Sequence, residues 1–349
     1  MILVWGGGAI GGTLAAYWVR AGVPVTMVDI EAQHVAASRS SGLQIEGPVD
    51  EFSVVVPAFT PAELSGRFEH VVLAVKAHMT EAALDSLLPH LADDGYVLSA
   101  QNGLNEIAIA ERVGAQRTMG CFVNFGADWL GPGRILYGNR GAVVVGEIDH
   151  AIRERTRQMH RWLQLVEPDA ILSDNIDGYL WGKLAYGAML FATALTNDSM
   201  SANFADPARR RTFIALGREV IGLAHKRGVT PVGFGQFDPQ AFGERASDAA
   251  ADAVIQWLSH YTSLTAKTHS GIWRDLAIRR RPTEVDAQVG LLVDLAGTSG
   301  WRTPLLARLV TLIHDIEAGR RALSADAFDE LSRSLDMTAP DPTTTARPR

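Results

Sequence analysis

The chain begins with a short apolar run, Ile2–Trp5, that leads directly into the glycine-rich stretch Gly6–Gly12. An apolar run of this length that ends at glycine predicts a buried parallel strand. We expect a helix from about Ile10 to Ala21, with Gly22 as its C-terminal stop. A second apolar run, Val25–Val28, predicts the next strand. Strand, turn, helix and strand in this order predict a βαβ unit at the N-terminus.

The glycines of the first turn match the pattern G-x-G-x-x-G at Gly6, Gly8 and Gly11. In this pattern the first glycine permits the tight turn, the second lets the backbone approach a pyrophosphate, and the third allows close packing of helix on strand. The first helical N–H groups, near Ala9 and Ile10, add a partial positive charge. A glycine-rich turn without a ligand is the simpler alternative. The surrounding strand and helix favour a dinucleotide site.

Asp29, at the end of the second predicted strand, bears on the choice of dinucleotide. A carboxylate there can accept hydrogen bonds from the adenosine ribose of NAD. The 2′-phosphate of NADP would meet a repulsion of roughly 3 kcal/mol per unit charge at about 5 Å and an effective dielectric of about 20. Ile30 and Glu31 follow, so no adjacent base offsets it. We therefore expect NAD(H) to be preferred, with NADP(H) possible; the alternative is that Asp29 only caps a turn.

Alternating strand and helix signals continue through the first half and predict a doubly wound, mostly parallel sheet, an α/β Rossmann domain. Lys76 follows the strand expected at Val71–Val75, and Asn102 follows the one at Tyr96–Ser99. Ligands bind beyond the carboxyl ends of such strands, so both side chains are candidates for the cofactor cleft. The alternatives are a solvated loop lysine and a turn-forming asparagine. Further strands are expected at Leu43–Ile45, Phe52–Val56, Thr118–Val123, and, as an antiparallel extension of the sheet, Arg134–Tyr137 and Ala142–Val145.

Helical patterns replace strand signals after Asp174. We expect a Rossmann dinucleotide-binding domain over residues 1–170, an all-α domain for substrate and dimerisation over 171–336, and a disordered tail rich in Pro and Thr over 337–349. Asp206-Pro207 and Thr303-Pro304 each place a cap residue before a first-turn proline. The expected helices are Ile176–Ala194, Pro207–Lys226, Ala249–Thr265, Glu284–Leu295 and Pro304–Ala318.

Charge and cysteine content narrow the class of protein. The net charge of −7 gives no general attraction to nucleic acid or to an anionic membrane. Cys121 is the only cysteine, so we expect neither an intrachain disulfide nor a thiolate metal site. The first apolar run is too short for a signal peptide or a membrane span. These features indicate a cytoplasmic protein that acts on a small molecule.

Taken together, the motifs resemble the ketopantoate reductase (2-dehydropantoate 2-reductase) family over nearly the whole chain, as a divergent member. The lysine-centred and glutamate-centred motifs are more specific than the glycine turn, which many Rossmann proteins share. The motifs that carry the resemblance are Gly6–Gly12, Ala74-Val75-Lys76-Ala77, Gln101-Asn102-Gly103, Leu180-Trp181-Gly182-Lys183-Leu184 and Arg281-Pro282-Thr283-Glu284-Val285-Asp286.

The resemblance implies roles for particular residues. Lys183 matches the lysine that acts as general acid in reduction of a 2-keto acid. Glu284 matches the glutamate that orients substrate and lysine. Asn102 matches the asparagine beside the nicotinamide, and Lys76 also borders the active site. A homodimer through the helical domain is implied as well. The simpler interpretations are an exposed helix lysine and a first-turn glutamate that serves the helix dipole.

Four positions depart from the family pattern or leave it open. Gly187 and Phe191 stand where the family commonly has substrate-binding asparagines. The serine that holds the substrate carboxylate falls in the stretch Ser270-Gly271, so either Ser270 or Gly271 occupies its place. Arg274 is an alternative carboxylate ligand because a guanidinium binds one bidentately. A site without those polar contacts favours a less polar molecule. We expect a 2-keto or 2-hydroxy acid, or a related carbonyl compound, with a larger apolar group, and not ketopantoate itself.

Two other functions remain open. A 3-hydroxy acid dehydrogenase also pairs such an N-terminal domain with a helical one, but its glycine-rich substrate signature is not evident at Asn124–Ala127. A catalytically silent NAD-binding sensor would need none of Lys183, Asn102 and Glu284. The presence of all three favours the enzyme, whose reaction can run as carbonyl reduction or as alcohol oxidation.

Overall fold

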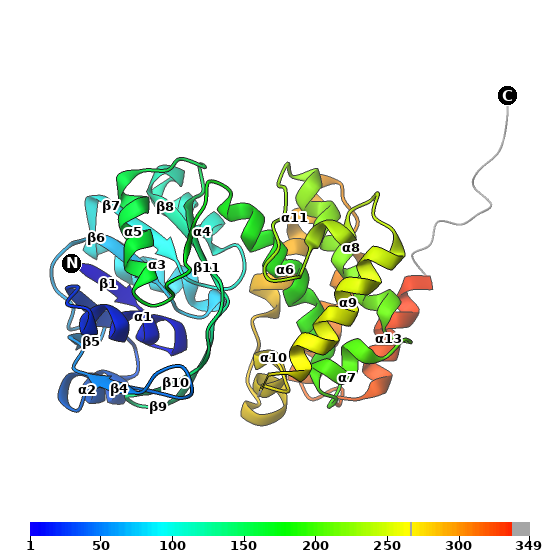
Figure 1. The fold of residues 1–349 in the computed structure, drawn as a ribbon, viewed down its shortest axis with the longest axis horizontal. Helices are drawn as coiled ribbons and strands as arrows, with labels where there is room; N and C mark the ends of the chain where they lie inside the picture. The colour runs from blue at the N-terminus through cyan, green and yellow to red at the C-terminus, as the bar shows by residue number, and fades with distance from the viewer. Residues whose placement is uncertain (266, 337–349) are drawn as a thin grey trace. The chain divides into compact units, whose positions relative to one another are not determined.

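The computed structural model describes residues 1–265 and 267–336 (Figure 1). The chain forms two compact units, one over Met1–Leu180 and a second that begins at Trp181, so the division falls inside one long helix. The boundary that we expected after residue 170 lies shortly before this division. The disorder expected for residues 337–349 lies outside the described residues.

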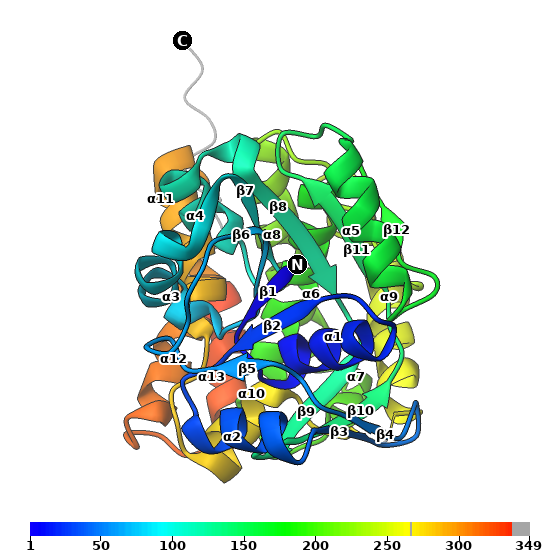
Figure 2. The ribbon, with the colours of Figure 1, turned by 90° about the vertical axis from the view of Figure 1, so that its left-hand side faces the viewer.

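The first unit contains a sheet of eight strands in the order β12-β11-β8-β7-β6-β1-β2-β5, much of which is visible in Figure 2. All neighbours pair in parallel except β11 and β8, which are antiparallel. This confirms the doubly wound, mostly parallel Rossmann sheet. The strands are β1 (Ile2–Trp5), β2 (Val25–Val28), β5 (Ala58–Phe59), β6 (Phe68–Leu73), β7 (Leu91–Ser99), β8 (Thr118–Val123), β11 (Val143–Glu147) and β12 (Ile171–Leu172).

Both faces of this sheet are covered, which explains why its strands are apolar throughout. Successive side chains of a strand point to opposite faces, and β1 shows the consequence. Ile2 and Val4 pack in one core with α1 (Ala9–Arg20) and α5 (Glu154–Gln164), whereas Leu3 and Trp5 pack in another with α3 (Thr80–Leu87) and α4 (Asn105–Val113). The sheet is therefore buried on both faces, and the loops that follow its parallel strands lie together at its carboxyl edge.

A second, four-stranded sheet corrects part of the sequence-based prediction. Its order is β4-β3-β10-β9, with β3 and β10 parallel and the outer pairs antiparallel. We expected Leu43–Ile45 and Phe52–Val56 within the mostly parallel sheet and Arg134–Tyr137 as its antiparallel extension; this was wrong, because strand signals alone do not say which strand pairs with which. Their bounds are β3 (Leu43–Glu46), β4 (Phe52–Val54), β9 (Gly126–Gly131) and β10 (Arg134–Asn139). The helix α2 (Ala32–Ser40), the strand β5 and the strand β9 were not predicted.

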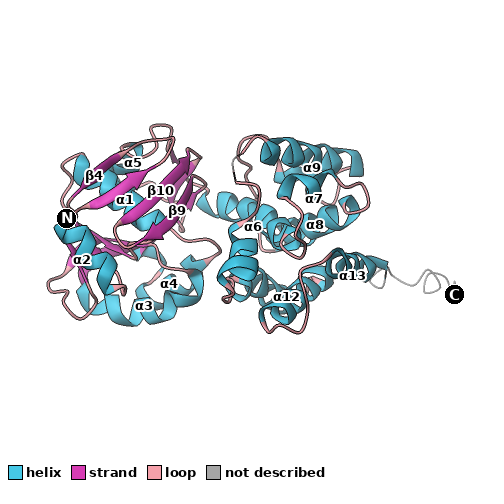
Figure 3. Cartoon of the chain, turned by 90° about the horizontal axis from the view of Figure 1, so that it is seen from below, coloured by secondary structure: helices cyan, strands magenta, loops and turns pink. Residues whose placement is uncertain are grey.

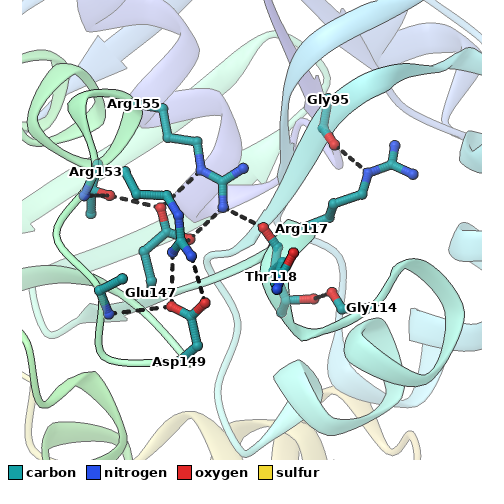
Figure 4. Close-up of polar contacts among 11 residues, drawn as sticks. Gly95, Gly114, Arg117, Thr118, Glu147, Asp149, Arg153 and Arg155 are labelled. Atoms are coloured by element: carbon teal, nitrogen blue, oxygen red, sulfur yellow. Dashed lines mark hydrogen bonds and ion pairs between the residues drawn. The ribbon is translucent and has the colours of Figure 1, made fainter.

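A buried carboxylate fastens the end of β11 to α5 (Figure 4). Glu147 is fully buried and accepts hydrogen bonds from Nε of Arg155 (2.9 Å) and Oγ1 of Thr156 (2.7 Å). Arg155 also donates to the carbonyl of Gln116, just before β8, and Arg153 pairs with Asp149. A buried charge is tolerated when it is paired and fully hydrogen-bonded, so this network holds the antiparallel edge of the sheet in place.

The second unit is helical, and every named strand in the described residues ends by Leu172 (Figure 3). In that described part, every helix is too short or too polar to span a bilayer. The first helix, α6, runs from Ile176 to Thr193. The others are α7 (Met200–Ala205), α8 (Arg210–Lys226), α9 (Asp248–Ser263), α10 (Gly271–Trp273), the π-helical turns Arg274–Arg279 and Asp286–Gly290, α11 (Leu291–Ser299), α12 (Pro304–Glu317) and α13 (Ala325–Asp336).

The two predicted cap–proline pairs differ in outcome. Pro304 stands at the start of α12 as expected, but Thr303 makes no side-chain cap bond. Instead, the carboxylate of Glu219 on α8 accepts the backbone N–H groups of Leu305 and Leu306, both at 2.9 Å. Asp206 caps a turn through Ala208 N–H, and α8 begins only at Arg210. The cap on α12 comes from a distant residue, which no local pattern could indicate.

The Glu219 cap predicts a pH dependence of stability. Burial raises the pKa of Glu219 from 4.5 to about 7, although the two backbone N–H groups oppose the shift. The fold therefore favours the protonated carboxyl, and this contribution is full below about pH 4.5 and lost as pH rises through about 7. We expect the free energy of unfolding of the wild type to fall over that range, by a few kcal/mol at most, relative to Glu219→Gln. Urea unfolding of both proteins between about pH 5 and pH 8 measures this, and parallel pH profiles would contradict it.

Candidate active site

The glycine-rich turn between β1 and α1 has a conformation that only glycine suits at two of its positions. Gly6 has a φ of +103°, and a Cβ there would lie 2.9 Å from backbone atoms of Ala74 and Val75. A Cβ on Gly11 would lie 2.0 Å from the carbonyl oxygen of Gly6. A Cβ on Gly8, in contrast, would meet nothing within 4 Å. Gly8 is thus the place where another molecule can approach the backbone of the turn.

The N-terminus of α1 opens beside that space. Gly8 is its N-cap, and among the described residues no side chain caps the helix and no acidic residue lies in its first turn. Ala9 and Ile10 are half-buried. The first N–H groups of a helix carry a partial positive charge and bind anions well. The turn and the helix start therefore fit a phosphate group.

Asp29 contacts this turn directly. Its Oδ2 accepts the N–H of Gly7 at 2.7 Å, and its Oδ1 accepts the N–H of Glu31 at 2.9 Å. The side chain is half-buried at the carboxyl end of β2. A carboxylate has about four acceptor positions, so two remain for hydroxyl groups of a ligand. Asp29 thus braces the turn, a role that sequence reasoning did not assign to it.

Lys76 and Asn102 lie on loops that are tied together. Both are exposed, and they follow the neighbouring parallel strands β6 and β7. Between them, the buried amide of Gln101 donates to the carbonyl of Val75 (3.0 Å) and to Oγ1 of Thr80 (2.8 Å). The Gln101 bridge holds the residues next to Lys76 and Asn102 side by side at the carboxyl edge of the sheet, where the sequence predicted both residues to lie.

The loops after β1, β2, β6 and β7 therefore form one continuous group at the carboxyl edge of the sheet. Gly6 approaches Ala74, Gly7 bonds Asp29, and Gln101 bonds Val75. Ligands bind at this edge of open α/β sheets. Within residues 1–265 and 267–336, no group of three or more His, Cys, Asp or Glu side chains is placed to hold a metal ion. The arrangement fits an extended phosphate-bearing ligand.

In the second unit, Lys183 lies on α6 and is half-buried. A Cβ on the preceding Gly182 would lie 2.1 Å from the carbonyl oxygen of Val232, so the helix packs closely against backbone at this turn. One turn later, a Cβ on Gly187 would lie 3.8 Å from Oε1 of Gln288. Gly187 therefore leaves room beside an amide that comes from another segment.

That segment also carries Glu284. Glu284 is half-buried just before a π-helical turn, and its carbonyl accepts the N–H of Gln288 at 3.1 Å. The neighbouring Thr283 donates from N–H and Oγ1 to Oε1 of Glu317, both at 2.7 Å, and its Oγ1 accepts the N–H of Val285. Thr283 thus starts the helical segment, as the sequence predicts. Gln288 and Gly187 bring the helices of Glu284 and Lys183 together within the second unit.

The remaining predicted substrate residues have mixed surroundings. Phe191 on α6 is fully buried. Ser270 is also buried, and its Oγ accepts the N–H of Trp273 at 3.2 Å as the N-cap of α10. Arg274 is half-buried at the start of a π-helical turn, a feature that is frequent at functional sites. Contact of any of these with substrate stays a prediction.

Sequence reasoning missed two site-bordering residues. His34 on α2 bonds the carbonyl of Gly7, but α2 is short and polar and gives no strong periodic signal. Gln288 sits four residues after Glu284, and only the three-dimensional contact with Gly187 gives it meaning. Lys183 and Glu284 belong to the second unit and Lys76 and Asn102 to the first, so their meeting around one substrate stays a prediction.

Two family models, one for each part of the same protein family, match this chain. The family model for ketopantoate reductase PanE/ApbA matches residues 2–150, and the model for the C-terminal part of that family matches residues 175–317. A 2-dehydropantoate 2-reductase of Mesorhizobium japonicum is 27% identical over 347 residues, with 93% of this chain and 99% of the relative covered. The similarity therefore extends through both units.

Two solved structures share the fold. A D-mandelate dehydrogenase with NADH and anilino(oxo)acetate superposes with a TM-score of 0.79 at 20% identity, covering 91% of this chain and 99% of that one. A PanE/ApbA family ketopantoate reductase from Ralstonia eutropha superposes with a TM-score of 0.72 at 24% identity, covering 92% and 100%. At these identities the likeness establishes the architecture.

Proposed function

Because the chain belongs to the ketopantoate reductase family, an oxidoreductase family that acts on CH–OH groups, we propose that it is an NAD(H)-dependent enzyme for a 2-keto or 2-hydroxy acid less polar than ketopantoate. It transfers hydride between nicotinamide C4 and the carbonyl or carbinol carbon. The cofactor part of this proposal rests on one observation: the space beside Gly8 is open, next to the N-terminus of α1, which no side chain of the described residues caps.

The cofactor is held by the carboxyl edge of the first unit. The N–H groups of Gly8, Ala9 and Ile10 receive the pyrophosphate, Gly6 and Gly11 shape the turn, and Asp29 receives the adenosine ribose. Lys76 and Asn102 border the nicotinamide end. When bound, the nicotinamide supplies or accepts the hydride.

Three residues carry the chemistry of the proposed reaction. Reduction of a keto carbon leaves negative charge on its oxygen, which the ammonium of Lys183 stabilises before it donates a proton. The carboxylate of Glu284 favours the charged lysine and keeps it in place. Asn102 orients the reacting groups from the first unit. In the opposite direction, Lys183 accepts the proton of the alcohol.

The substrate side of the proposal rests on α6. Gly187 leaves space, and Gln288 supplies an amide beside it. Phe191 stands on the same helix where the family commonly has a polar asparagine, and it is fully buried. Ser270 or Arg274 is the candidate ligand of the substrate carboxylate. This combination suits a 2-keto acid with a bulky apolar group. The fold-level likeness to a D-mandelate dehydrogenase agrees with such a substrate. We also propose that the helical unit forms a homodimer.

Asp29 predicts a preference for NADH over NADPH. In the proposed binding mode, Asp29 and Glu31 would put negative charge near the 2′-phosphate of NADPH, and Ile30 between them is exposed and uncharged. A repulsion of about 3 kcal/mol corresponds to a preference of about a hundredfold. Fluorescence titration with both dinucleotides measures it. Asp29→Asn removes the negative charge but keeps an oxygen that can accept a hydrogen bond from the turn, so it should reduce the preference for NADH over NADPH. Equal affinities of the wild type for NADH and NADPH would refute the role of Asp29 in cofactor choice.

A substrate panel tests the whole proposal. Absorbance of the nicotinamide band is followed with NADH and a series of 2-keto acids of increasing apolar size, and with NAD and the matching 2- and 3-hydroxy acids. We expect the largest kcat/KM for a 2-keto acid bulkier than ketopantoate. A larger kcat/KM for 3-hydroxy acids than for 2-hydroxy acids would favour the alternative of a 3-hydroxy acid dehydrogenase. NADH binding without turnover of any compound would favour a sensor.

A further inference from the structure

His34 is a buried histidine whose two ring nitrogens are both engaged by the backbone around the glycine-rich turn. It lies on α2 and is 1% exposed. One ring nitrogen, Nε2, is 2.8 Å from the carbonyl oxygen of Gly7. The other, Nδ1, accepts the N–H of Gly133 at 2.9 Å and lies 3.3 Å from the indole N–H of Trp129. The ring thus joins the turn to the β9–β10 hairpin.

These contacts determine the protonation state of the ring. The amide of Gly133 and the indole of Trp129 can only donate, so Nδ1 must offer a lone pair. The carbonyl of Gly7 can only accept, so Nε2 must carry the hydrogen. His34 is therefore neutral and in the Nε2–H tautomer. A second proton on Nδ1 would point at two donors and would break the bond to Gly133.

The bond to Gly7 also sets the direction of the next N–H group. In a trans peptide the carbonyl of Gly7 and the N–H of Gly8 point in opposite directions. His34 draws that carbonyl toward α2, so the N–H of Gly8 points the other way. On the other side, Asp29 holds the N–H of Gly7 at 2.7 Å. Both peptide groups of Gly7 are therefore held by side chains.

We propose that His34 is a positioning residue that orients the Gly8 N–H for the cofactor pyrophosphate. The proposal rests on the proposed function, because the anion at Gly8 is taken to be the cofactor.

Two substitutions separate positioning from packing. His34→Gln keeps one donor and one acceptor on a single amide, whereas His34→Leu keeps bulk and loses both bonds. At about pH 8 we expect the NADH dissociation constant to rise about tenfold in His34→Leu and to stay within about threefold of wild type in His34→Gln.

The outcomes are distinguishable from failure of the proposed function. If the wild type binds NADH and His34→Leu binds it equally well, or if His34→Gln binds it as weakly as His34→Leu, the positioning role is overturned. If the wild type binds no dinucleotide, the proposed function fails, but ¹⁵N-histidine NMR still tests the hydrogen bonds of His34 to the turn. The His34 signals are assigned by their absence from the spectrum of His34→Gln, which serves even if His34→Leu does not fold. The wild-type spectrum should show the Nε2–H tautomer of His34. An Nδ1–H tautomer or an imidazolium at about pH 8 would overturn the inference.

Discussion

Replacing Lys183 with alanine is expected to lower kcat by about 10²- to 10⁴-fold while leaving the NADH dissociation constant nearly unchanged. The ammonium acts only when negative charge develops on the substrate oxygen, so its loss affects the transition state more than cofactor binding. Lys183 is half-buried on α6, in the second unit, whereas the proposed dinucleotide site lies in the first. Steady-state kinetics on the best substrate of the panel and a separate NADH titration measure the two effects.

Two control variants make the Lys183 result specific. Lys226→Ala removes an exposed lysine at the end of α8 and should leave kcat unchanged. Lys183→Arg keeps the positive charge but donates a proton poorly, because a guanidinium stays protonated. It should recover substrate binding more than kcat. If Lys183→Ala turned over as fast as Lys226→Ala, the general-acid role of Lys183 would be refuted.

Replacing Gly11 with alanine is expected to destabilise the first unit strongly. The added Cβ would lie 2.0 Å from the carbonyl oxygen of Gly6, 2.9 Å from Cβ of Ala74 and 3.0 Å from Cγ1 of Val4. The first of these atoms is backbone and cannot rotate away, so α1 must move off β1. We expect a loss of about 3 kcal/mol or more in the free energy of unfolding. Urea unfolding followed by circular dichroism measures it.

The matched control for Gly11 is another glycine within a helix. Gly297 lies in α11, and a Cβ there meets nothing within 4 Å. Gly297→Ala should be neutral or stabilising by about 0.5–1 kcal/mol, because alanine favours the helix. Equal unfolding midpoints for Gly11→Ala and Gly297→Ala would show that the close contact in the turn is not as tight as the geometry requires.

The β1–α1–β2 unit could be predicted from sequence because its signals are local. An apolar run, a glycine pattern and a helix stop lie next to one another, and the structure places β1, α1 and β2 within a residue of the expected bounds. Lys76 and Asn102 could be placed for the same reason, since each follows a strong strand signal. The resemblance to a family then added Lys183 and Glu284, which periodicity alone would have left as ordinary helix residues.

The rest depended on contacts between distant parts of the chain. The second sheet forms because β3 pairs in parallel with β10, and nothing near Leu43 indicates that partner. His34 acquires its role only because Gly133 and Gly7 meet at its ring. Glu219 likewise caps a helix that begins far along the chain. Such pairings are tertiary, so residue type and local spacing do not reveal them.

The most direct measurement of the central claim compares NADH binding by the wild type and Gly8→Ala. A Cβ on Gly8 meets no protein atom within 4 Å, so the variant should unfold at the same urea concentration as the wild type. The same methyl group would occupy the space through which the pyrophosphate reaches the backbone. We expect an NADH dissociation constant at least about tenfold higher in Gly8→Ala. Equal affinities in two equally stable proteins would contradict a dinucleotide bound across this turn.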